Sequence, residues 1–204
     1  MITIVDYGLG NILAFANVYK RLGITVAIAK DVSELTSATK LILPGVGAFD
    51  HAMKLLMQSG MRDALDEMVI SGGVPVLGVC VGMQILAATS EEGYLPGLGW
   101  VPGKVRAFRH NEQSARMPLP HMGWNDIRPR GASALFEGLE SDARFYFLHS
   151  YYFQCDHEED ISAETVYGTQ FSCAVQKKNI FGVQFHPEKS HNFGTQLLKN
   201  FAGI

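Results

Sequence analysis

The sequence predicts an α/β protein, a doubly wound three-layer α/β/α sandwich with a mostly parallel central sheet and an antiparallel extension. Three observations support this prediction. Short apolar runs alternate with helical segments over the first half, aromatic and β-branched segments joined by turn residues fill the second half, and an amphipathic segment closes the chain. The first pattern is typical of parallel strands buried by helices on both faces.

Composition limits the classes of protein to consider. A chain of 204 residues with 47% hydrophobic residues can bury a sizeable core, so we expect one domain over residues 1–204. The net charge is −3 and no block of Lys or Arg appears, so neither nucleic acid nor a membrane is expected as partner. The three cysteines, Cys80, Cys155 and Cys173, lack the spacing of a zinc site, so we expect no metal and free thiols. Free thiols are typical of a reducing compartment, so we expect a cytoplasmic protein, and we expect no cofactor.

The first half contains four nearly continuous apolar runs, each bounded by polar or turn residues. These predicted strands are ITIVD (2–6), TVAIAK (25–30), KLILPG (40–45) and VPVLGV (74–79). A helix is expected over 11–23 with Gly23 as its stop, and another helical region over 51–73, broken at Gly60. This βαβαβ succession indicates a doubly wound, flavodoxin-like sandwich.

The second half has a different pattern, in which aromatic residues and turn residues alternate. The segments expected as strands are 98–108, 122–129, 144–155, 163–170, 171–179 and 180–188. They predict an antiparallel extension that returns to the main sheet. The stretch 109–120 is the most loop-like, and a final helix is expected over 192–202.

Cys80 lies in the pattern Gly-x-Cys-x-Gly at the end of a predicted strand. A helix can begin at Val81, so Cys80 would occupy a strand-to-helix turn with Gly78 and Gly82 relieving crowding, as in a nucleophile elbow. A helix terminus behind the sulfur favours the thiolate. A buried core cysteine at a tight turn explains the same five residues equally well.

A second segment, GVQFHPEKS, contains a base for such a thiol. The apolar run 180–185 would deliver His186 to the end of a strand, and Glu188 could orient its imidazole after Pro187 breaks the strand. A solvated turn is the alternative. The carboxyl ends of parallel strands meet at one sheet edge, and this favours a site that joins His186 to Cys80.

The segment LPGVGAF (43–49) could complete the chemistry. Glycines on both sides of Val46 let the backbone approach a ligand, so the N–H groups of Val46 and Val81 could form an oxyanion hole. An ordinary Gly/Pro turn is the alternative for this segment alone. Together the three segments indicate acyl transfer by a Cys-His-Glu triad.

Several motifs, in this order and spacing, resemble the class I glutamine amidotransferases. They are DYGLGN, PGVGAF, GVCVGMQ, PHMGWN, FLHSYYF and GVQFHPEKS, and they extend over essentially the whole chain. Within the family, the resemblance is greatest to the glutaminase subunits of imidazole glycerol phosphate synthases.

The resemblance implies roles for individual residues. Cys80 would attack the side-chain amide of L-glutamine, His186 would carry the proton to the leaving ammonia, and Glu188 would orient His186. Positions that match substrate contacts in the family are Gly45, Gln84, Ser150 and Tyr151. Val46 and Val81 match the backbone donors of the oxyanion hole.

The resemblance also implies a partner, a (β/α)₈ cyclase subunit that forms a heterodimer with this chain and receives the ammonia. Its products would be imidazole glycerol phosphate and an aminoimidazole carboxamide ribotide of histidine biosynthesis. Residues that match the family's interface are Asn11, Trp124, Tyr146 and Lys189. For Trp124 and Tyr146, ordinary aromatic packing is an equal alternative.

Two other functions stay open at this stage. Some segments, such as GNILAFANVYKRLG, resemble a paralogous branch that supplies ammonia for an amidino sugar in surface polysaccharide synthesis. A non-catalytic flavodoxin-like binding module is disfavoured because Cys80, Gln84, His186 and Glu188 occur together. The remaining histidines are expected in packing or on the surface, with His149 supporting the substrate strand.

Overall fold

The central sheet begins with five parallel strands. The computed structural model describes residues 1–204, and its strand order there is β2-β1-β3-β4-β13. These strands are β1 (Ile2–Val5), β2 (Val26–Ala29), β3 (Lys40–Gly45), β4 (Val76–Cys80) and β13 (Ile180–Val183). Every residue of β1, β4 and β13 is buried, which explains their nearly continuous apolar sequences. The predicted mostly parallel sheet is confirmed.

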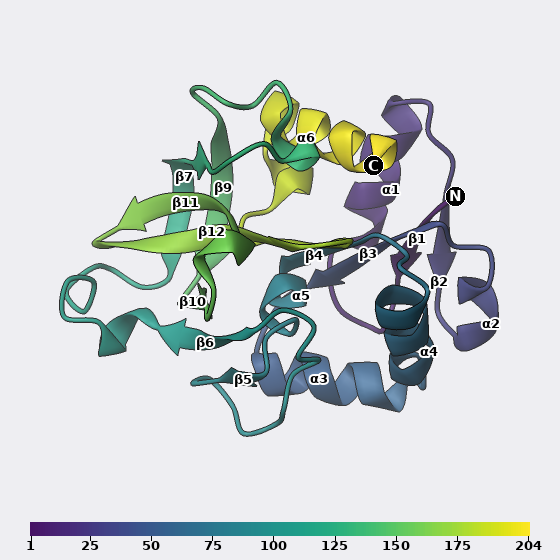
Figure 1. The fold of residues 1–204 in the computed structure, drawn as a ribbon, viewed down its shortest axis with the longest axis horizontal. Coiled ribbons are helices and arrows are strands. Elements are labelled where there is room, and N and C mark those ends of the chain that lie inside the picture. Colours follow the sequence, from purple (N-terminus) through teal and green to yellow (C-terminus); the bar gives the residue numbers. More distant parts are fainter.

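Helices cover both faces of this sheet (Figure 1). On one face lie α1 (Ile12–Arg21) and α6 (His191–Gly203), and on the other α3 (Phe49–Gln58) and α4 (Arg62–Asp66). A π-helical turn over Glu67–Ser71 follows α4, and the short α2 (Val32–Leu35) follows β2. The predicted break between α3 and α4 occurs at Gly60, whose φ is +72°. None of the helices combines the length and apolar character needed to cross a membrane.

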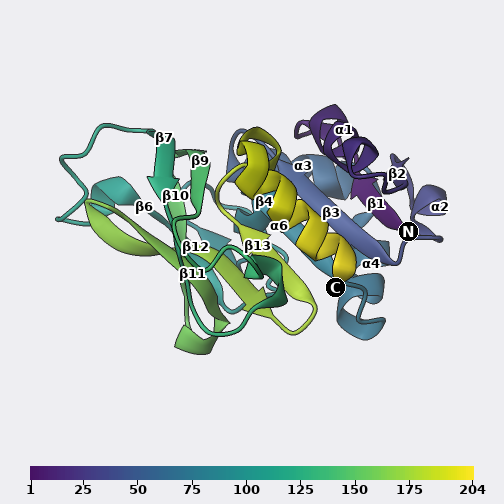
Figure 2. The same ribbon diagram turned by 90° about the horizontal axis from the view of Figure 1, so that it is seen from above.

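Helix α1 illustrates how an amphipathic sequence packs on the sheet. Phe15, Val18 and Tyr19 are buried, whereas Leu13 on the opposite side is 69% exposed. The Tyr19 hydroxyl donates a hydrogen bond of 3.1 Å to the carbonyl of Leu198. This contact ties α1 to α6, which lies beside it in both views (Figures 1 and 2).

The sheet continues beyond β13 into the predicted antiparallel extension. Its strands are β12 (Thr169–Lys177), β10 (Tyr151–Cys155), β6 (Gly103–Ala107), β5 (Thr89–Ser90), β11 (Ile161–Tyr167) and β8 (Arg128–Pro129). A separate antiparallel ribbon pairs β7 (His121–Asp126) with β9 (Arg144–His149). Figure 2 shows the extension and the ribbon together at one end of the molecule, away from α1.

The segment 144–155 differs from its prediction as a single strand. It divides at Ser150 into β9, which pairs with β7, and β10, which pairs with β6 in the other sheet. The carbonyl of Ser150 accepts a hydrogen bond from the amide of Phe108, which fixes the break at the end of β6. The chain therefore changes sheets at Ser150, a change that a continuous aromatic pattern does not reveal.

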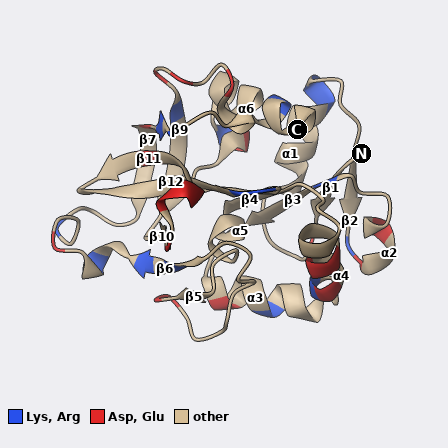
Figure 3. Ribbon diagram, in the orientation of Figure 1, with Lys and Arg blue, Asp and Glu red and all other residues tan.

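Charged side chains are distributed over the whole ribbon diagram. Figure 3 shows Lys and Arg interspersed with Asp and Glu, which agrees with the small net charge of −3. Charged residues occur both on helices that cover the sheet, such as α4, and on strands such as β6. The distribution of charged residues therefore does not mark a binding surface for a highly charged partner.

Candidate active site

The turn at Cys80 has the strained geometry expected of a nucleophile elbow. Cys80 ends β4 with φ 56° and ψ −113°, outside the conformations that L-residues ordinarily adopt. A Cβ at Gly82 would lie 1.9 Å from the carbonyl oxygen of Leu43, and one at Gly78 would lie 2.6 Å from the carbonyl oxygen of Gly82. Both glycines are therefore required for close packing of the turn against β3 and against itself.

The helix behind Cys80 is shorter than its sequence suggests. Helix α5 (Val81–Gln84) has only four residues, although VGMQILAAT could continue for two turns. The carbonyls of Ile85, Leu86 and Ala87 accept hydrogen bonds from the amides of residues 98, 101 and 99, respectively, instead of from a next helical turn. The dipole behind the sulfur is that of a single turn, so the expected helix stabilisation of the thiolate is correspondingly small.

The sulfur of Cys80 lies at the bottom of a pocket between the sheet and the ribbon. Its side chain is only 4% exposed, and Sγ is 3.9 Å from the carbonyl oxygen of Leu148 in β9. On the other side, Gln184 Nε2 lies 3.8 Å from Sγ and can donate to it. Gln184 is fully buried, and sequence reasoning did not select it.

His186 connects the thiol to a carboxylate. Its Nδ1 lies 2.9 Å from Glu188 Oε1, and both side chains are nearly completely buried. Burial by itself lowers the pKa of His186, but hydrogen bonds to Cys80 and Glu188, together with their negative charges, raise it to about 9. The structure therefore brings Cys80, His186 and Glu188 together, from β4 and from the turn after β13.

The turn that carries His186 is fastened to the ribbon. The His186 amide donates 2.9 Å to the carbonyl of Tyr146, and the Tyr146 amide donates 3.0 Å to Ser190 Oγ. Ser190 Oγ in turn donates to the carbonyl of His186 at 2.6 Å. The strand expected to reach Phe185 ends at Val183 because the chain leaves β13 here to bond with β9.

A pocket of about 290 Å³ opens above Cys80. Residues that line it and that the sequence had selected are Val46, Cys80, Val81, Gln84, Ser150, Tyr151, His186 and Lys189. Gly45 lies beneath the pocket, in register with Cys80 across the β3–β4 pair. A Cβ at Gly45 would lie 2.5 Å from the amide nitrogen of Gly82, so glycine allows the two turns to touch.

The side chain of Gln84 has a fixed orientation. Its Nε2 donates to the carbonyl of Tyr151 at 3.1 Å and to Gln184 Oε1 at 3.0 Å. Both amide hydrogens are thereby used within the protein. Gln84 Oε1 is the atom left to accept a hydrogen bond from a molecule in the pocket.

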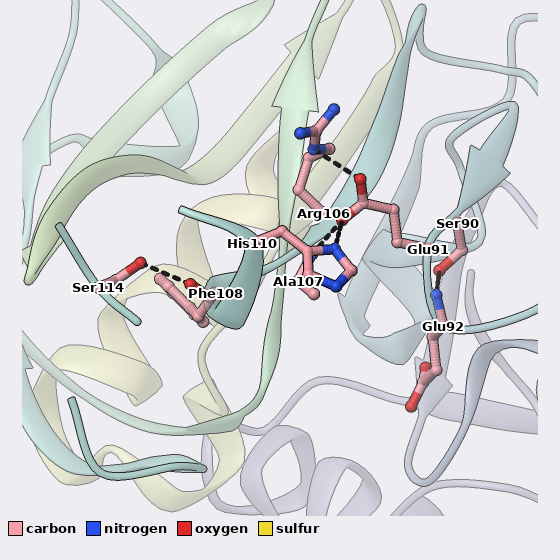
Figure 4. Close-up of polar contacts among 8 residues, drawn as sticks. All are labelled: Ser90, Glu91, Glu92, Arg106, Ala107, Phe108, His110 and Ser114. Carbon is pink, nitrogen blue, oxygen red and sulfur yellow. Dashed lines mark hydrogen bonds and ion pairs between the residues drawn. The ribbon is translucent and has the colours of Figure 1, made fainter. Parts of the chain in front are cut away.

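Glu92 is a lining residue that sequence reasoning missed. Its Oε2 accepts from the Phe49 amide at 2.8 Å, and burial raises the pKa of its carboxyl group. The neighbouring Glu91 extends in the opposite direction and bonds to Arg106, to His110 and to the Ala107 amide (Figure 4). Glu91 thus anchors the turn to the end of β6 and leaves Glu92 at the pocket. The acidic pair EE has no motif that would have distinguished these two roles.

The four positions selected for a partner interface lie around the pocket's edge or before α1. Trp124 stacks on His191 at 5.3 Å and meets Tyr146 edge-on at 6.2 Å, while Lys189 Nζ lies 5.9 Å from the centre of the Tyr146 ring. Asn11 is exposed at the start of α1, and its carbonyl accepts from the Ala14 amide. The aromatic alternative also holds here, because Trp124 and Tyr146 pack on each other.

The outer face of the ribbon leaves apolar side chains exposed beside the pocket. Met122 is 65% exposed, Trp124 44% and Leu148 37%, and the pairing of β7 with β9 places Met122 opposite Leu148. The inward residues Phe145 and Phe147 are fully buried. The ribbon therefore has one buried face and one partly exposed apolar face, which we call the docking face.

Comparison with known proteins places the whole chain among similar sequences and folds. A family model described as glutamine amidotransferase class-I matches residues 3–203. An imidazole glycerol phosphate synthase subunit HisH from Bdellovibrio bacteriovorus is 62% identical, and one from Leptospira interrogans is 52% identical, each over 100% of both chains. A protein named HisH 2 from Pseudomonas aeruginosa is 46% identical over the same shares.

Solved structures resemble the fold at much lower identity. A crystal structure titled glutamine amidotransferase superposes with a TM-score of 0.76 at 21% identity, covering 100% of this chain and 99% of the other. PurLQS from Thermotoga maritima gives a TM-score of 0.73 at 16% identity, covering 99% and 97%. The shared architecture is the α/β/α sandwich with its extension.

Proposed function

This chain belongs to the class I glutamine amidotransferase family, and we propose that it is the glutaminase subunit of an imidazole glycerol phosphate synthase of histidine biosynthesis. The observation that carries the proposal is Cys80 on its strained turn, in a pocket with the His186–Glu188 pair. The full-length identities of 62% and 52% to relatives named as subunits of that synthase support the pathway.

The geometry suits hydrolysis of a carboxamide in two steps. The Cys80 thiolate attacks the side-chain amide carbon of L-glutamine, and His186 gives its proton to the leaving nitrogen, so that ammonia departs and a γ-glutamyl thioester remains. Water then attacks the thioester while His186 accepts its proton, and glutamate and the thiol are released. Glu188 holds Nδ1 and so directs the other imidazole nitrogen toward the sulfur.

The pocket offers partners for several polar groups of glutamine. Gln84 Oε1 accepts from the substrate, and Glu92 lies where a carboxylate could pair with the α-ammonium group. Ser150 and Tyr151 line the pocket, and Gly45 is paired with Cys80 next to it; in this proposal all three contact the substrate. Backbone N–H groups of Val46 and Val81 would stabilise the oxyanion.

The docking face supports the proposal of a protein partner. Its apolar side chains lie next to the pocket, so a subunit that covers Trp124 and Leu148 would sit where ammonia leaves Cys80. We propose a (β/α)₈ cyclase as this subunit, in a heterodimer that includes Asn11, Tyr146 and Lys189. One core cluster of 53 residues supports treating residues 1–204 as a single domain, and three free thiols suit the reducing cytoplasm.

The test of the chemistry is ammonia release from L-glutamine by the chain in complex with its cyclase. Cys80→Ala should lower the rate of ammonia release by about 10³-fold or more. Cys80→Ser, which keeps nearly the same side-chain shape, serves as the isosteric comparison. Cys155→Ala is the matched control and leaves the rate unchanged. Undiminished release by Cys80→Ala would contradict the triad.

The pathway needs a separate experiment, since an amidino-sugar pathway uses the same half-reaction. The chain, expressed with its own cyclase, should restore growth of a histidine auxotroph that lacks both subunits. Failure with an active glutaminase would favour the surface-polysaccharide alternative. The chain alone should hydrolyse glutamine poorly and gain activity when the cyclase and its acceptor are added.

A further inference from the structure

Two buried histidines, one of which (His149) lines the pocket, form a direct hydrogen bond that the triad does not use. His121 Nδ1 lies 2.9 Å from His149 Nε2, and the two side chains are 3% and 6% exposed. His121 is stacked between Phe147 at 4.8 Å and Tyr167 at 4.1 Å. An imidazole pair in such a cage needs a defined arrangement of protons, because two facing N–H groups would repel.

The neighbours of the pair determine that arrangement. His149 Nδ1 lies 2.7 Å from the carbonyl oxygen of Tyr151 and must therefore donate, which leaves His149 Nε2 to accept from His121 Nδ1. At the other end, Asn125 Nδ2 lies 3.3 Å from His121 Nε2, and Asn125 Oδ1 accepts from the Asp126 amide. Both rings are thus neutral with the proton on Nδ1. Burial agrees with this, since it lowers the pKa of His121 to about 4 and of His149 to about 3.

The carbonyl of Tyr151 joins this pair to the catalytic side of the pocket. It accepts from His149 Nδ1 and also from Gln84 Nε2. Gln84 Nε2 donates in addition to Gln184 Oε1, which turns the amide nitrogen of Gln184 toward Cys80 Sγ at 3.8 Å. An amide turned the other way would place an oxygen against the sulfur, and an oxygen lone pair repels a thiolate.

We propose that these groups form one hydrogen-bond relay that fixes which way the side-chain amides of Gln84 and Gln184 face at the active site. The relay runs from Asn125 through His121, His149, Tyr151 and Gln84 to Gln184. Gln184 Nε2 donates to the Cys80 thiolate, and Gln84 Oε1 faces the substrate. Gln184 touches the reacting atom and is a catalytic residue in this account. His121 and His149 act through others and are positioning residues.

This inference deepens the proposed function and rests on it for the identity of the substrate. Its first half needs no substrate, since the orientation of Gln184 concerns the thiol itself. Hydrogen bonds to a charged acceptor are about twice as strong as those between neutral groups, so a correctly turned amide favours the thiolate.

The protonation pattern can be measured on the unaltered full-length chain. ¹⁵N-resolved NMR of the imidazoles at pH 7 should show His121 and His149 neutral, each protonated at Nδ1, whereas free histidine prefers Nε2. His121→Asn and His149→Asn assign the two signals. A proton on Nε2 of either ring, or a charged ring at pH 7, would overturn the relay.

The link to the thiol is tested by alkylation of Cys80 with iodoacetamide at pH 7. Burial raises the pKa of Cys155 to about 12 and that of the buried Cys173 well above its usual value, so the reaction reports on Cys80, with Cys80→Ala as the blank. Gln184→Leu and Gln184→Glu should lower the rate about tenfold, Glu the more, by loss of one charge-assisted hydrogen bond. Gln196→Leu on α6 is the matched control and keeps the wild-type rate.

Variants of His149 distinguish the loss of its hydrogen-bond donor from the change in side-chain size. His149→Phe removes the donor to Tyr151 and should slow alkylation several-fold and raise the KM for glutamine, whereas His149→Asn keeps a donor near Nδ1 and should restore most of both. His157→Phe, at an exposed histidine, controls for the substitution. Equal rates for His149→Phe and wild type, or no rescue by His149→Asn in chains with native circular dichroism, would refute the relay. Failure of the proposed function would instead appear as ammonia release by Cys80→Ala, while the alkylation rates of the Gln184 and His149 variants would still differ from wild type as predicted.

Discussion

The parallel strands and the β7–β9 ribbon build the same pocket but bury their residues in different ways. All five residues of β4 are buried, whereas along β7 His121 is buried and Met122 and Trp124 are 65% and 44% exposed. Burial on both faces fixes β4 so firmly that Cys80 can hold a strained conformation at its end. The ribbon has one free face, and this leaves a surface for a partner beside the chemistry.

The parallel strands and the ribbon therefore have different roles in the site. The parallel edge holds the nucleophile and the backbone groups around it, where an error of a fraction of an ångström affects the reaction. The ribbon supplies Leu148, His149 and the start of the Ser150 turn, and its Tyr146 is bonded through the backbone to His186. A partner that moves the ribbon would therefore act on both catalytic groups, on His186 through Tyr146 and on Cys80 through the Leu148 carbonyl.

The largest effect is expected where the two regions meet, at Glu188. Glu188→Gln keeps the shape but removes the charge that orients and stabilises the His186 imidazolium, so kcat should fall by about 10³ to 10⁴ with KM nearly unchanged. Steady-state kinetics of the complex measure this. A fall of less than tenfold would show that the carboxylate has only a structural role.

A second large effect is expected on the parallel side, at Gly82. Gly82→Ala places a Cβ 1.9 Å from the Leu43 carbonyl oxygen, so β3 and the turn must separate. We expect a loss of about 3 kcal/mol in the free energy of unfolding, typical of overpacking in a core. Urea unfolding measures it, with Gly203→Ala as control because nothing lies within 4 Å of that Cβ. Equal stabilities would contradict the close packing.

The ribbon side should respond in binding rather than in stability. Trp124→Ala removes a large apolar contact from the docking face and should raise the Kd for the cyclase about 30-fold, as for a hot-spot residue. The unfolding midpoint should change little. Calorimetric titration compares it with Val166→Ala, at an exposed residue of β11. A matching loss of affinity in both variants would place the interface elsewhere.

The smallest effect concerns the charge of His186. Its pKa in the folded chain is raised from 6.5 to about 9, so the stability it contributes is complete below pH 6.5 and is lost as the pH rises through about 9. Cys80→Ala removes the hydrogen bond to the sulfur, so both the pKa of His186 and this loss of stability should decrease. NMR titration and urea unfolding between pH 6 and 10 check the direction. An unchanged His186 pKa in the variant would show that His186 is not coupled to Cys80.

Sequence reasoning succeeded where one local pattern has one structural meaning. Apolar runs predicted β1, β3 and β4 because strands covered on both faces have no polar side, and Gly-x-Cys-x-Gly placed Cys80 at a turn. The helix expected to begin at Val81 is confirmed, but its length could not be predicted, because the distant amides of residues 98, 99 and 101 bond to the carbonyls that follow α5.

Features built from several distant segments could not be predicted in this way. The division at Ser150 depends on a choice between two sheets, which have the same aromatic alternation. Glu92 reaches the pocket because Glu91 is bonded to β6, and His121 meets His149 only after β7 pairs with β9. Such contacts depend on tertiary register, which no spacing along the chain encodes.

In the proposed reaction, glutamine acylates Cys80. The most direct measurement is mass spectrometry of the acid-quenched complex with its cyclase during turnover of L-glutamine. We expect a glutamyl adduct on the peptide that contains Cys80, and we expect it to be absent without glutamine and in Cys80→Ala. Steady ammonia release with no adduct at Cys80, or an adduct on another residue, would contradict it.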